Sequence, residues 1–250
     1  MRVALLSDVH ANLQALQACL AHARTQGVDQ YAFLGDLVGY GAQPRAVLEE
    51  IMALAGDGAW VLKGNHDEMA ANPPPVQQVM GESTALWTHD QLDEAQLAFL
   101  DGLPLLLQCP PLLLVHASAD APGLWRYVYD AAMAEVSLQA AQAQPDVRYV
   151  FGGHVHRQVL YFHGADGRLQ PLAPTPGVAI PVPAHRHWLA TIGSVGQPRD
   201  GDPRAMYAVF DAERAELVFH RVVYDHAAAA AAIRQAGLPE FFALRLEWGR

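Results

Sequence analysis

RVALLSDVH, at residues 2–10, joins a short apolar run rich in β-forming residues to a polar cluster. The same pattern occurs twice more, as QYAFLGD at 30–36 and as AWVLKGNHD at 59–67. Between these runs, apolar residues recur at helical spacing over 13–23 and 43–55. This βαβαβ order predicts a parallel sheet with helices packed against it. Ligands of such sheets bind beyond the carboxyl ends of the strands, where the polar clusters fall.

The rest of the chain is expected to form a second, mixed sheet with further helices. We expect two helices within 83–101, a strand at 112–115, a helix at 130–143, a strand at 147–151, strands and turns to about 223, and helices at 226–236 and 239–246. Asn72-Pro73-Pro74-Pro75 is incompatible with a regular element and predicts an exposed loop. The pattern therefore predicts an α/β fold of two mixed sheets packed face to face. It would form one domain, 1–250, with a helical and loop insertion around 68–104 and C-terminal helices at 226–248.

Composition excludes several classes of protein. The 250 residues are 52% hydrophobic and 17% charged, which supports a sizeable core and excludes an extensively disordered chain. The net charge of -10 repels polyphosphates and disfavours binding to long nucleic acid. Two cysteines, Cys19 and Cys109, make no disulfide framework. Without a signal peptide or an apolar run of about 18 residues, a cytoplasmic protein with no membrane span is expected.

Five loops carry side chains of the types that bind metals, each directly after an expected strand. These side chains are Asp8 and His10, Asp36, Asn65 and His66, His116, and His154 with His156. Taken singly, each motif is as easily an exposed polar pair, a turn or a core histidine, but their joint order indicates a metal centre. The D-x-H and H-x-H spacings place two side chains on one side of an extended segment. Imidazole together with carboxylate suits Zn, Mn, Fe, Co or Ni. With two oxygens, Asp36 can bridge two ions.

The motifs together resemble the five sequence blocks of the calcineurin-like metallophosphoesterases. The blocks are DVH at 8–10, GDLVGYG at 35–41, GNHD at 64–67, VHAS at 115–118 and GGHVH at 152–156. The similarity covers at least residues 3–199. GSVGQPRDGDPRA at 193–205 and AGLPEFFALRL near the C-terminus resemble the small bacterial phosphodiesterase branch. The resemblance implies a four-layer α/β/β/α sandwich and a centre of two transition-metal ions.

Carried over position by position, the resemblance assigns the ligands. One ion would be held by Asp8, His10, Asp36 and His156, and the second by Asp36, Asn65, His116 and His154. His66 matches the family's catalytic histidine. It would stabilise developing charge or protonate the leaving group while a metal-bound hydroxide attacks phosphorus.

Departures from the family pattern narrow the expected activity. The related protein Ser/Thr phosphatases carry GDxVDRG, whose second Asp and Arg assist the catalytic histidine and the phosphate. Gly39 and Tyr40 stand at those positions here, which disfavours phosphoprotein substrates and leaves open which group orients His66; the adjacent Asp67 is a candidate. A retromer scaffold subunit with this fold lacks the catalytic histidine, so a non-catalytic scaffold is the alternative of another class.

The expected activity is hydrolysis of small phosphodiesters or nucleotide-like esters. A phosphomonoesterase and an enzyme resembling the Ser/Thr phosphatases are the alternatives. Arg126, Arg157 and Arg199 are candidate phosphate contacts, with a solvated arginine as the other interpretation of each. Tyr40 and Trp125 are candidate pocket walls, although Trp125 fits core packing equally well. The segment from Asn72 to Met80 is expected to narrow access near the GNHD loop.

Overall fold

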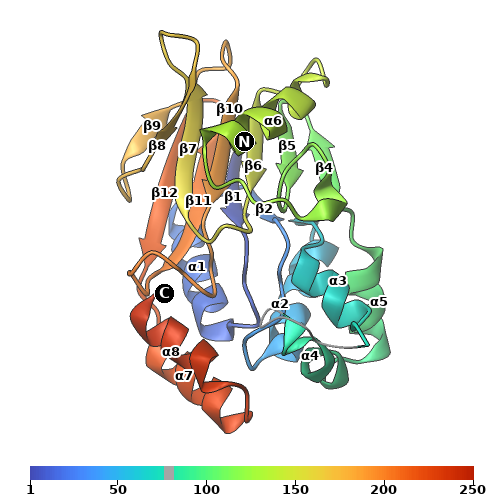
Figure 1. Ribbon diagram of the computed structural model, residues 1–250. Helices are drawn as coiled ribbons and strands as arrows, with labels where there is room; N and C mark the ends of the chain where they lie inside the picture. Colours follow the sequence, from blue (N-terminus) through green and yellow to red (C-terminus); the bar gives the residue numbers. More distant parts are fainter. Residues whose placement is uncertain (76–81) are drawn as a thin grey trace.

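Two six-stranded sheets form the centre of the protein in the computed structural model, which describes residues 1–75 and 82–250 (Figure 1). The strands of the first sheet are, in spatial order, β3 (Trp60–Val61), β2 (Gln30–Phe33), β1 (Arg2–Leu6), β11 (Ala205–Asp211), β12 (Glu216–Val222) and β9 (Ala179–Pro181). Those of the second are β4 (Leu106–Cys109), β5 (Leu112–Val115), β6 (Tyr149–Gly152), β10 (Trp188–Ile192), β7 (Gln158–His163) and β8 (Leu169–Leu172).

Both sheets mix parallel and antiparallel pairs. In the first, β1, β2 and β3 are parallel, as the βαβαβ pattern predicts, and β11, β12 and β9 add antiparallel neighbours. In the second, β5, β6 and β10 are parallel, with β4, β7 and β8 antiparallel at the two sides. β4, which ends at Cys109, pairs with β5 in a hairpin. The proline-rich sequence around Cys109 did not predict this strand.

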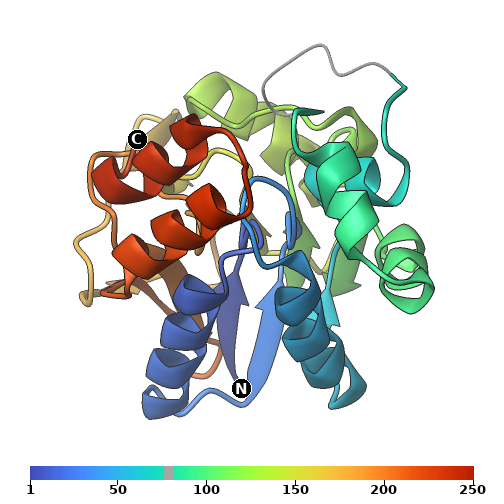
Figure 2. The same cartoon turned by 90° about the horizontal axis from the view of Figure 1, so that it is seen from below.

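Alternation along β1 explains why the sheets pack in layers. Val3 and Leu5 point into the apolar cluster between the two sheets, whereas Ala4 and Leu6 point into the cluster under the helices. α1 (Leu13–Thr25), α2 (Pro44–Gly56), α7 (His226–Gln235) and α8 (Glu240–Trp248) share that outer cluster (Figure 2). α6 (Ala131–Gln142) packs on the opposite side, against the second sheet. The order is therefore α/β/β/α, and the predicted four-layer fold is confirmed.

Between β3 and β4, the described residues form three α-helices: α3 (Asn65–Ala71), α4 (Ala85–Gln91) and α5 (Glu94–Gly102). α5 begins with a capping box, in which Asp93 accepts from the Gln96 N–H and the Gln96 side chain accepts from the Asp93 N–H. Within the described residues, no helix has both the length and the apolar character to cross a membrane.

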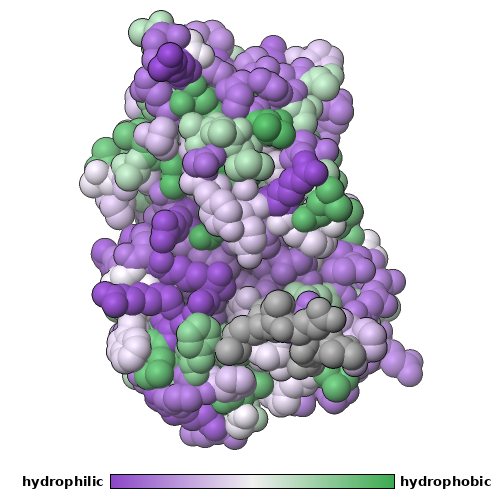
Figure 3. Space-filling model, viewed as in Figure 1, coloured by the Kyte–Doolittle hydropathy of each residue, from purple (hydrophilic) through white to green (hydrophobic). Residues whose placement is uncertain are grey.

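Of the segment expected to narrow access, residues 76–80 lie outside the described part of the chain. Hydrophilic side chains gather in a depression across the middle of the face in Figure 3.

Candidate metal centre

The carboxyl ends of strands from both sheets meet at one place, where the five motif loops converge. Backbone hydrogen bonds join the loops: the Asp8 N–H donates to the Gly35 carbonyl, and the His10 N–H donates to the Asp36 carbonyl, both at 3.0 Å. From the second sheet, the His154 N–H donates to Asp8 Oδ2 at 2.9 Å. Because β1, β2, β5 and β6 all end here, residues far apart in the sequence are brought together, as the strand-end rule predicts.

The loops are not extended, and this corrects the argument from D-x-H and H-x-H spacing. The φ angles of Asp8, His10, Asp36, His154 and His156 lie between 49° and 67°, in the left-handed region. Side chains there do not alternate as they do in a strand, and such backbone is uncommon for residues other than glycine. As a result Asp8 and His10 join the same group of ligands, whereas His154 and His156 point to different groups.

Two groups of buried side chains have the spacing of metal ligands. The first contains Asp8, His10 and His156, and the second contains Asp36, His116 and His154. His10 Nε2 lies 3.1 Å from His156 Nε2, and His116 Nε2 lies 3.2 Å from His154 Nδ1. A third combination places the ring of His66 near His10 and Asp36. These two groups contain six of the seven residues that the family resemblance implies as ligands, and their assignment to two ions stays a prediction.

Backbone carbonyls fix the tautomer of all four imidazoles. The accepting carbonyls are Val38 for His10 Nδ1 (3.2 Å), Leu34 for His116 Nδ1 (2.8 Å), Gln197 for His156 Nδ1 (2.6 Å) and Trp125 for His154 Nε2 (2.9 Å). Because the proton sits on the outward nitrogen, each neutral ring turns a lone pair inward. An outward N–H held by an acceptor is the usual support of a metal-binding histidine.

The inward nitrogens require a cation between them. Two lone pairs about 3 Å apart repel each other unless a proton or metal ion lies between, and these pairs are buried away from water. Asp36 adds a shared oxygen: Oδ2 lies 3.7 Å from His10 Nε2 and 3.3 Å from His116 Nε2. Its Oδ1 accepts from the His66 N–H at 2.8 Å. Asn65 Oδ1 is buried and has no hydrogen-bond partner, as expected of an oxygen reserved for an ion.

The electrostatics suit cations. Burial alone would raise the pKa of Asp8 and Asp36, but neighbouring histidines hold both carboxyl groups well below their usual range. Burial lowers the pKa of His10, and lowers that of His154 to about 3. Burial also acts to lower the pKa of His116, but the charge and hydrogen bond of Asp36 outweigh it and raise that pKa to about 9. Metal binding would displace the His116 proton, because a ligand imidazole is neutral.

His66 lies at the edge of this cluster, in the second position of α3. Its ring centroid is 4.2 Å from that of Tyr40 and 5.1 Å from that of His10. Gly39 has φ +88°, and a Cβ there would lie 2.7 Å from His66 Nδ1. A glycine at this position therefore makes room for the ring. Burial lowers the pKa of His66 to about 4.

Asp67 does not orient His66 through its carboxylate. Its Oδ1 accepts from the N–H groups of Leu37 (2.8 Å) and Val38 (3.2 Å), and its Oδ2 accepts from the Gly64 N–H (2.9 Å). Burial raises the pKa of Asp67 to about 7, and the charge of Asp36 acts in the same direction. The carboxylate joins the loop after β2 to the start of α3, so Asp67 is a positioning residue and not the catalytic partner suggested by its adjacency.

The candidate substrate contacts separate into three places. Tyr40 and Trp125 line a cavity of about 400 Å³ together with His66 and Asn65. Arg157 and Arg199 line a neighbouring cavity of about 310 Å³. Arg126 instead pairs with Asp120 and lines neither cavity, so its role as a phosphate contact stays a prediction.

Sequence reasoning missed four residues around the centre. The side chain of Gln197 accepts hydrogen bonds from Arg199 Nη2 (2.6 Å) and from Arg245 Nη1 (3.1 Å), and thereby links α8 to the loop that supports His156. Tyr127 and Tyr129 stack on each other, and Tyr127 stacks on His154. The alternation RYVY at 126–129, with Val128 buried, was the available signal.

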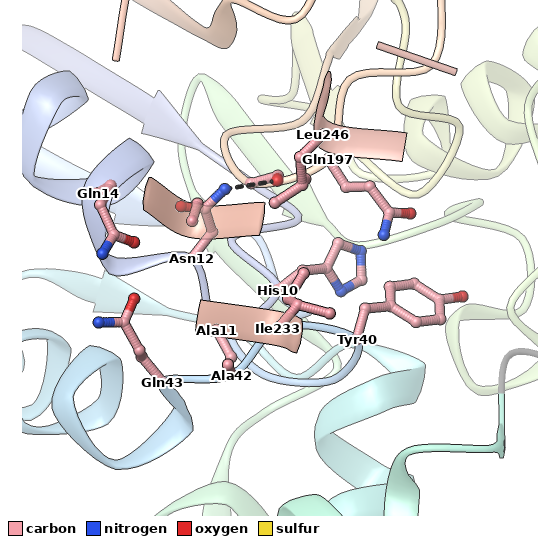
Figure 4. Close-up of a pocket in the computed structure, with 13 residues that line it drawn as sticks. His10, Ala11, Asn12, Gln14, Tyr40, Ala42, Gln43, Gln197, Ile233 and Leu246 are labelled. Carbon is pink, nitrogen blue, oxygen red and sulfur yellow. Dashed lines mark hydrogen bonds between the residues drawn. The ribbon is translucent and has the colours of Figure 1, made fainter. Parts of the chain in front are cut away.

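A small cavity is lined by His10 and by Tyr40, which also lines the cavity of about 400 Å³. Figure 4 shows the residues around it, among them Asn12 and Gln14, with Ile233 and Leu246 from the C-terminal helices. Its volume of about 10 Å³ is no more than one water molecule needs. This cavity is too small for a substrate.

Comparison with known proteins defines the class. Residues 1–215 match the calcineurin-like phosphoesterase superfamily domain, and the chain belongs to that superfamily. It is 31% identical over 254 aligned residues to the uncharacterized protein MJ0912 of Methanocaldococcus jannaschii, with 99% of this chain and 98% of that protein covered.

Two solved structures resemble it over nearly their whole length. A metallophosphoesterase from Sphaerobacter thermophilus is 36% identical, with a TM-score of 0.89 and coverage of 100% of this chain and 99% of that one. The hypothetical protein PH1004 from Pyrococcus horikoshii is 21% identical, with a TM-score of 0.80 and coverage of 100% and 98%, which shows the shared fold. Superfamily membership indicates a phosphoester hydrolase that uses metal ions, and the buried His/Asp groups fit that chemistry.

Proposed function

We propose that the protein is a dinuclear-metal phosphodiesterase acting on small esters. One observation carries the proposal: two buried carboxylates and four buried imidazoles, with all four outward ring nitrogens held by carbonyls, point their free electron pairs into two adjacent spaces. Asp36 Oδ2 faces both spaces and would be shared by two ions, and Asn65 Oδ1 would complete the second set of ligands. Mn, Fe, Zn, Co or Ni suits this mixture of nitrogen and oxygen ligands.

Bound ions would supply an activated water and neutralise charge on the phosphoryl oxygens. The residues of the chain do the remaining work. His66, held between Tyr40 and His10, faces the cavity that also contains Asn65. The N–H of the neutral ring would donate a hydrogen bond to the leaving oxygen. Proton transfer to that oxygen would require the protonated ring, which is the minor form near neutral pH because burial lowers the pKa of His66 to about 4. Asp67 keeps the His66 loop in register with the Asp36 loop by accepting three backbone N–H bonds.

The shape around the centre favours a diester. Phosphorus in a diester carries two ester groups. The cavity of about 400 Å³ is lined by His154 and Asn65 of the centre, and it shares Tyr127 with a second cavity of about 310 Å³. The positions that carry Asp and Arg in the Ser/Thr phosphatases remain Gly39 and Tyr40, and the net charge of -10 repels an acidic phosphoprotein at long range. These features support a small substrate over a folded one.

The test compares kcat/KM for three substrates with protein reconstituted with Mn²⁺. They are methyl p-nitrophenyl phosphate, p-nitrophenyl phosphate and a phosphoserine peptide. We expect the diester to be hydrolysed fastest. A phosphopeptide rate within about threefold of the best small substrate would overturn the preference. A monoester clearly ahead of the diester would make the protein a phosphomonoesterase, and retention of two ions without hydrolysis of any ester would favour the scaffold alternative.

A further inference from the structure

A ladder of stacked rings runs from the metal centre to the protein surface. Tyr127 stacks on His154 with ring centroids 3.9 Å apart and planes 23° apart. Tyr129 stacks on Tyr127 at 4.9 Å and 7°. The side chain of Tyr127 is 39% exposed and that of Tyr129 is 69% exposed. Neighbouring exposed aromatic side chains of this kind are a common mark of a binding surface, and neither tyrosine belongs to a metal-binding motif. The ladder therefore presents flat aromatic surface to solvent beside the proposed metal site.

The ladder forms one wall of the cavity of about 310 Å³, which we call the tyrosine pocket. Its other walls include Tyr161, Val159, Arg157 and Arg199. The volume is at the lower end of the range for small-molecule sites, roughly 300–1,000 Å³. An apolar, aromatic lining with a few polar groups at the rim is the usual character of such a site.

The two arginines give the pocket a positive charge in an acidic protein. Arg199 donates two hydrogen bonds to Gln197 Oε1, a neutral acceptor, and its guanidinium lies 5.7 Å from the centre of the Tyr40 ring. Across the described ranges, 1–75 and 82–250, no carboxylate forms an ion pair with Arg157 or Arg199. By contrast, Arg126, Arg204, Arg221 and Arg234 are all paired with carboxylates. Both guanidinium groups are available to a negatively charged ligand.

The geometry points to the tyrosine pocket as a binding site for the base of a nucleotide, with the scissile phosphate at the metal centre and Arg157 and Arg199 contacting a second anionic group. The inference rests on the proposed function for the position of the scissile phosphate. Three features select this ligand class: the outer ring face of Tyr129, which can stack on a base, two cations without carboxylate partners, and a connection through Tyr127 to His154.

Equilibrium binding tests the pocket without requiring turnover. Calorimetry with Mn²⁺-loaded protein would compare AMP with ribose 5-phosphate, which differ only in the base. We expect AMP to bind about fivefold to tenfold more tightly, the scale of one stacked base. Tyr129→Ala should remove most of this difference, and Tyr129→Phe, which keeps the ring, should retain it. Equal affinities of the wild-type protein for the two ligands, or a difference that Tyr129→Ala leaves intact, would overturn the inference.

The arginines are tested with the same assay and a second ligand pair. ADP should bind more tightly than AMP, and Arg157→Ala should reduce that advantage by about threefold to tenfold, as for one lost charge-assisted contact. Arg168→Ala is the matched control, because it removes an exposed arginine from the β7–β8 turn, away from the pocket. An equal loss in both variants would show a general charge effect and contradict the pocket.

The outcomes separate the two proposals. If AMP binds more tightly than ribose 5-phosphate but the protein hydrolyses no ester, the nucleotide pocket is supported and the proposed phosphodiesterase activity is wrong. If the protein hydrolyses simple diesters but binds AMP and ribose 5-phosphate equally well, the proposed phosphodiesterase activity is supported and the nucleotide pocket is wrong.

Discussion

Two clusters of buried imidazoles in this protein have similar compositions and different surroundings. At the strand ends, His10 and His156 face each other with their outward nitrogens held by carbonyls and with two carboxylates alongside. Under the helices, His220 stacks on Tyr207 at 4.9 Å, and His22 bonds the Tyr207 hydroxyl at 2.6 Å. In the described part of the chain, neither His22 nor His220 belongs to a group of side chains with the spacing of metal ligands. Burial of histidines alone does not make a metal site; inward lone pairs that converge on carboxylates do.

The largest expected effect comes from removing the carboxylate shared by the two ligand groups. Asp36→Asn should reduce bound metal and abolish hydrolysis, because Oδ2 faces both spaces and the amide supplies no negative charge. Metal analysis and a diester assay check this. Asp57→Asn, at the exposed end of α2, is the control and should leave both unchanged. Two ions and a normal rate in Asp36→Asn would show that the bridge is assigned wrongly.

Removing His66 should separate chemistry from metal retention. His66→Ala is expected to bind metal nearly normally while kcat falls by about 10²-fold or more, the scale of lost acid catalysis. The loss should shrink for esters with good leaving groups, since these need little protonation. The measurement is kcat for a series of aryl and alkyl diesters. Equal losses across the series would argue for charge stabilisation in place of proton transfer.

A matched pair of glycines tests the placement of the His66 ring. Gly39 (φ +88°) and Gly58 (φ +102°) both have left-handed backbone, but a Cβ at 39 would meet His66 Nδ1 at 2.7 Å while a Cβ at 58 meets nothing within 4 Å. Both alanine variants should lose about 1–2 kcal/mol of stability through backbone strain. Gly39→Ala alone should lower kcat, by about tenfold to a hundredfold, because the ring must move. Similar kcat values for the two variants would contradict this placement.

The smallest expected effect concerns the histidines of the second cluster. Burial, followed by the charges of His22 and Arg2, lowers the pKa of His220 to about 4. The unfolded chain binds that proton near pH 6.5, so stability that is present above about pH 6.5 is lost as the pH falls toward 4. With allowance for solvent screening, the contribution is about 1–2 kcal/mol.

His220→Phe keeps a ring against Tyr207 and removes the titration. Its melting temperature should therefore fall less than that of the wild type between about pH 7 and about pH 5, by about 2–6 °C. The comparison is made by thermal unfolding at both pH values, and the wild type reports the contribution of all other groups. An identical pH dependence in the two proteins would exclude His220 as a source of acid sensitivity.

Local sequence patterns were sufficient to predict the order of the elements and the chemistry of the donor set. Apolar periodicity located β1, β2, α1 and α2, because each element must bury one face. The strand-end rule then placed Asp8, Asp36 and Asn65 at one edge, and the motifs indicated the superfamily. These inferences needed only local sequence patterns, because the order of the elements and the residues at which each strand ends can be predicted from neighbouring positions in the chain.

Which side chains contact one another depends on the three-dimensional packing of the chain. Left-handed backbone at His154 and His156 directs them to different groups, which spacing along an extended segment could not reveal. The same holds for Asp67, whose carboxylate accepts backbone N–H bonds, and for Arg126, which pairs with Asp120. Tyr127 lies in the loop before α6, and it stacks on His154, which follows β6. Hydrogen bonds and stacking across long sequence separations depend on a few φ values and on packing, and neither is encoded in local periodicity.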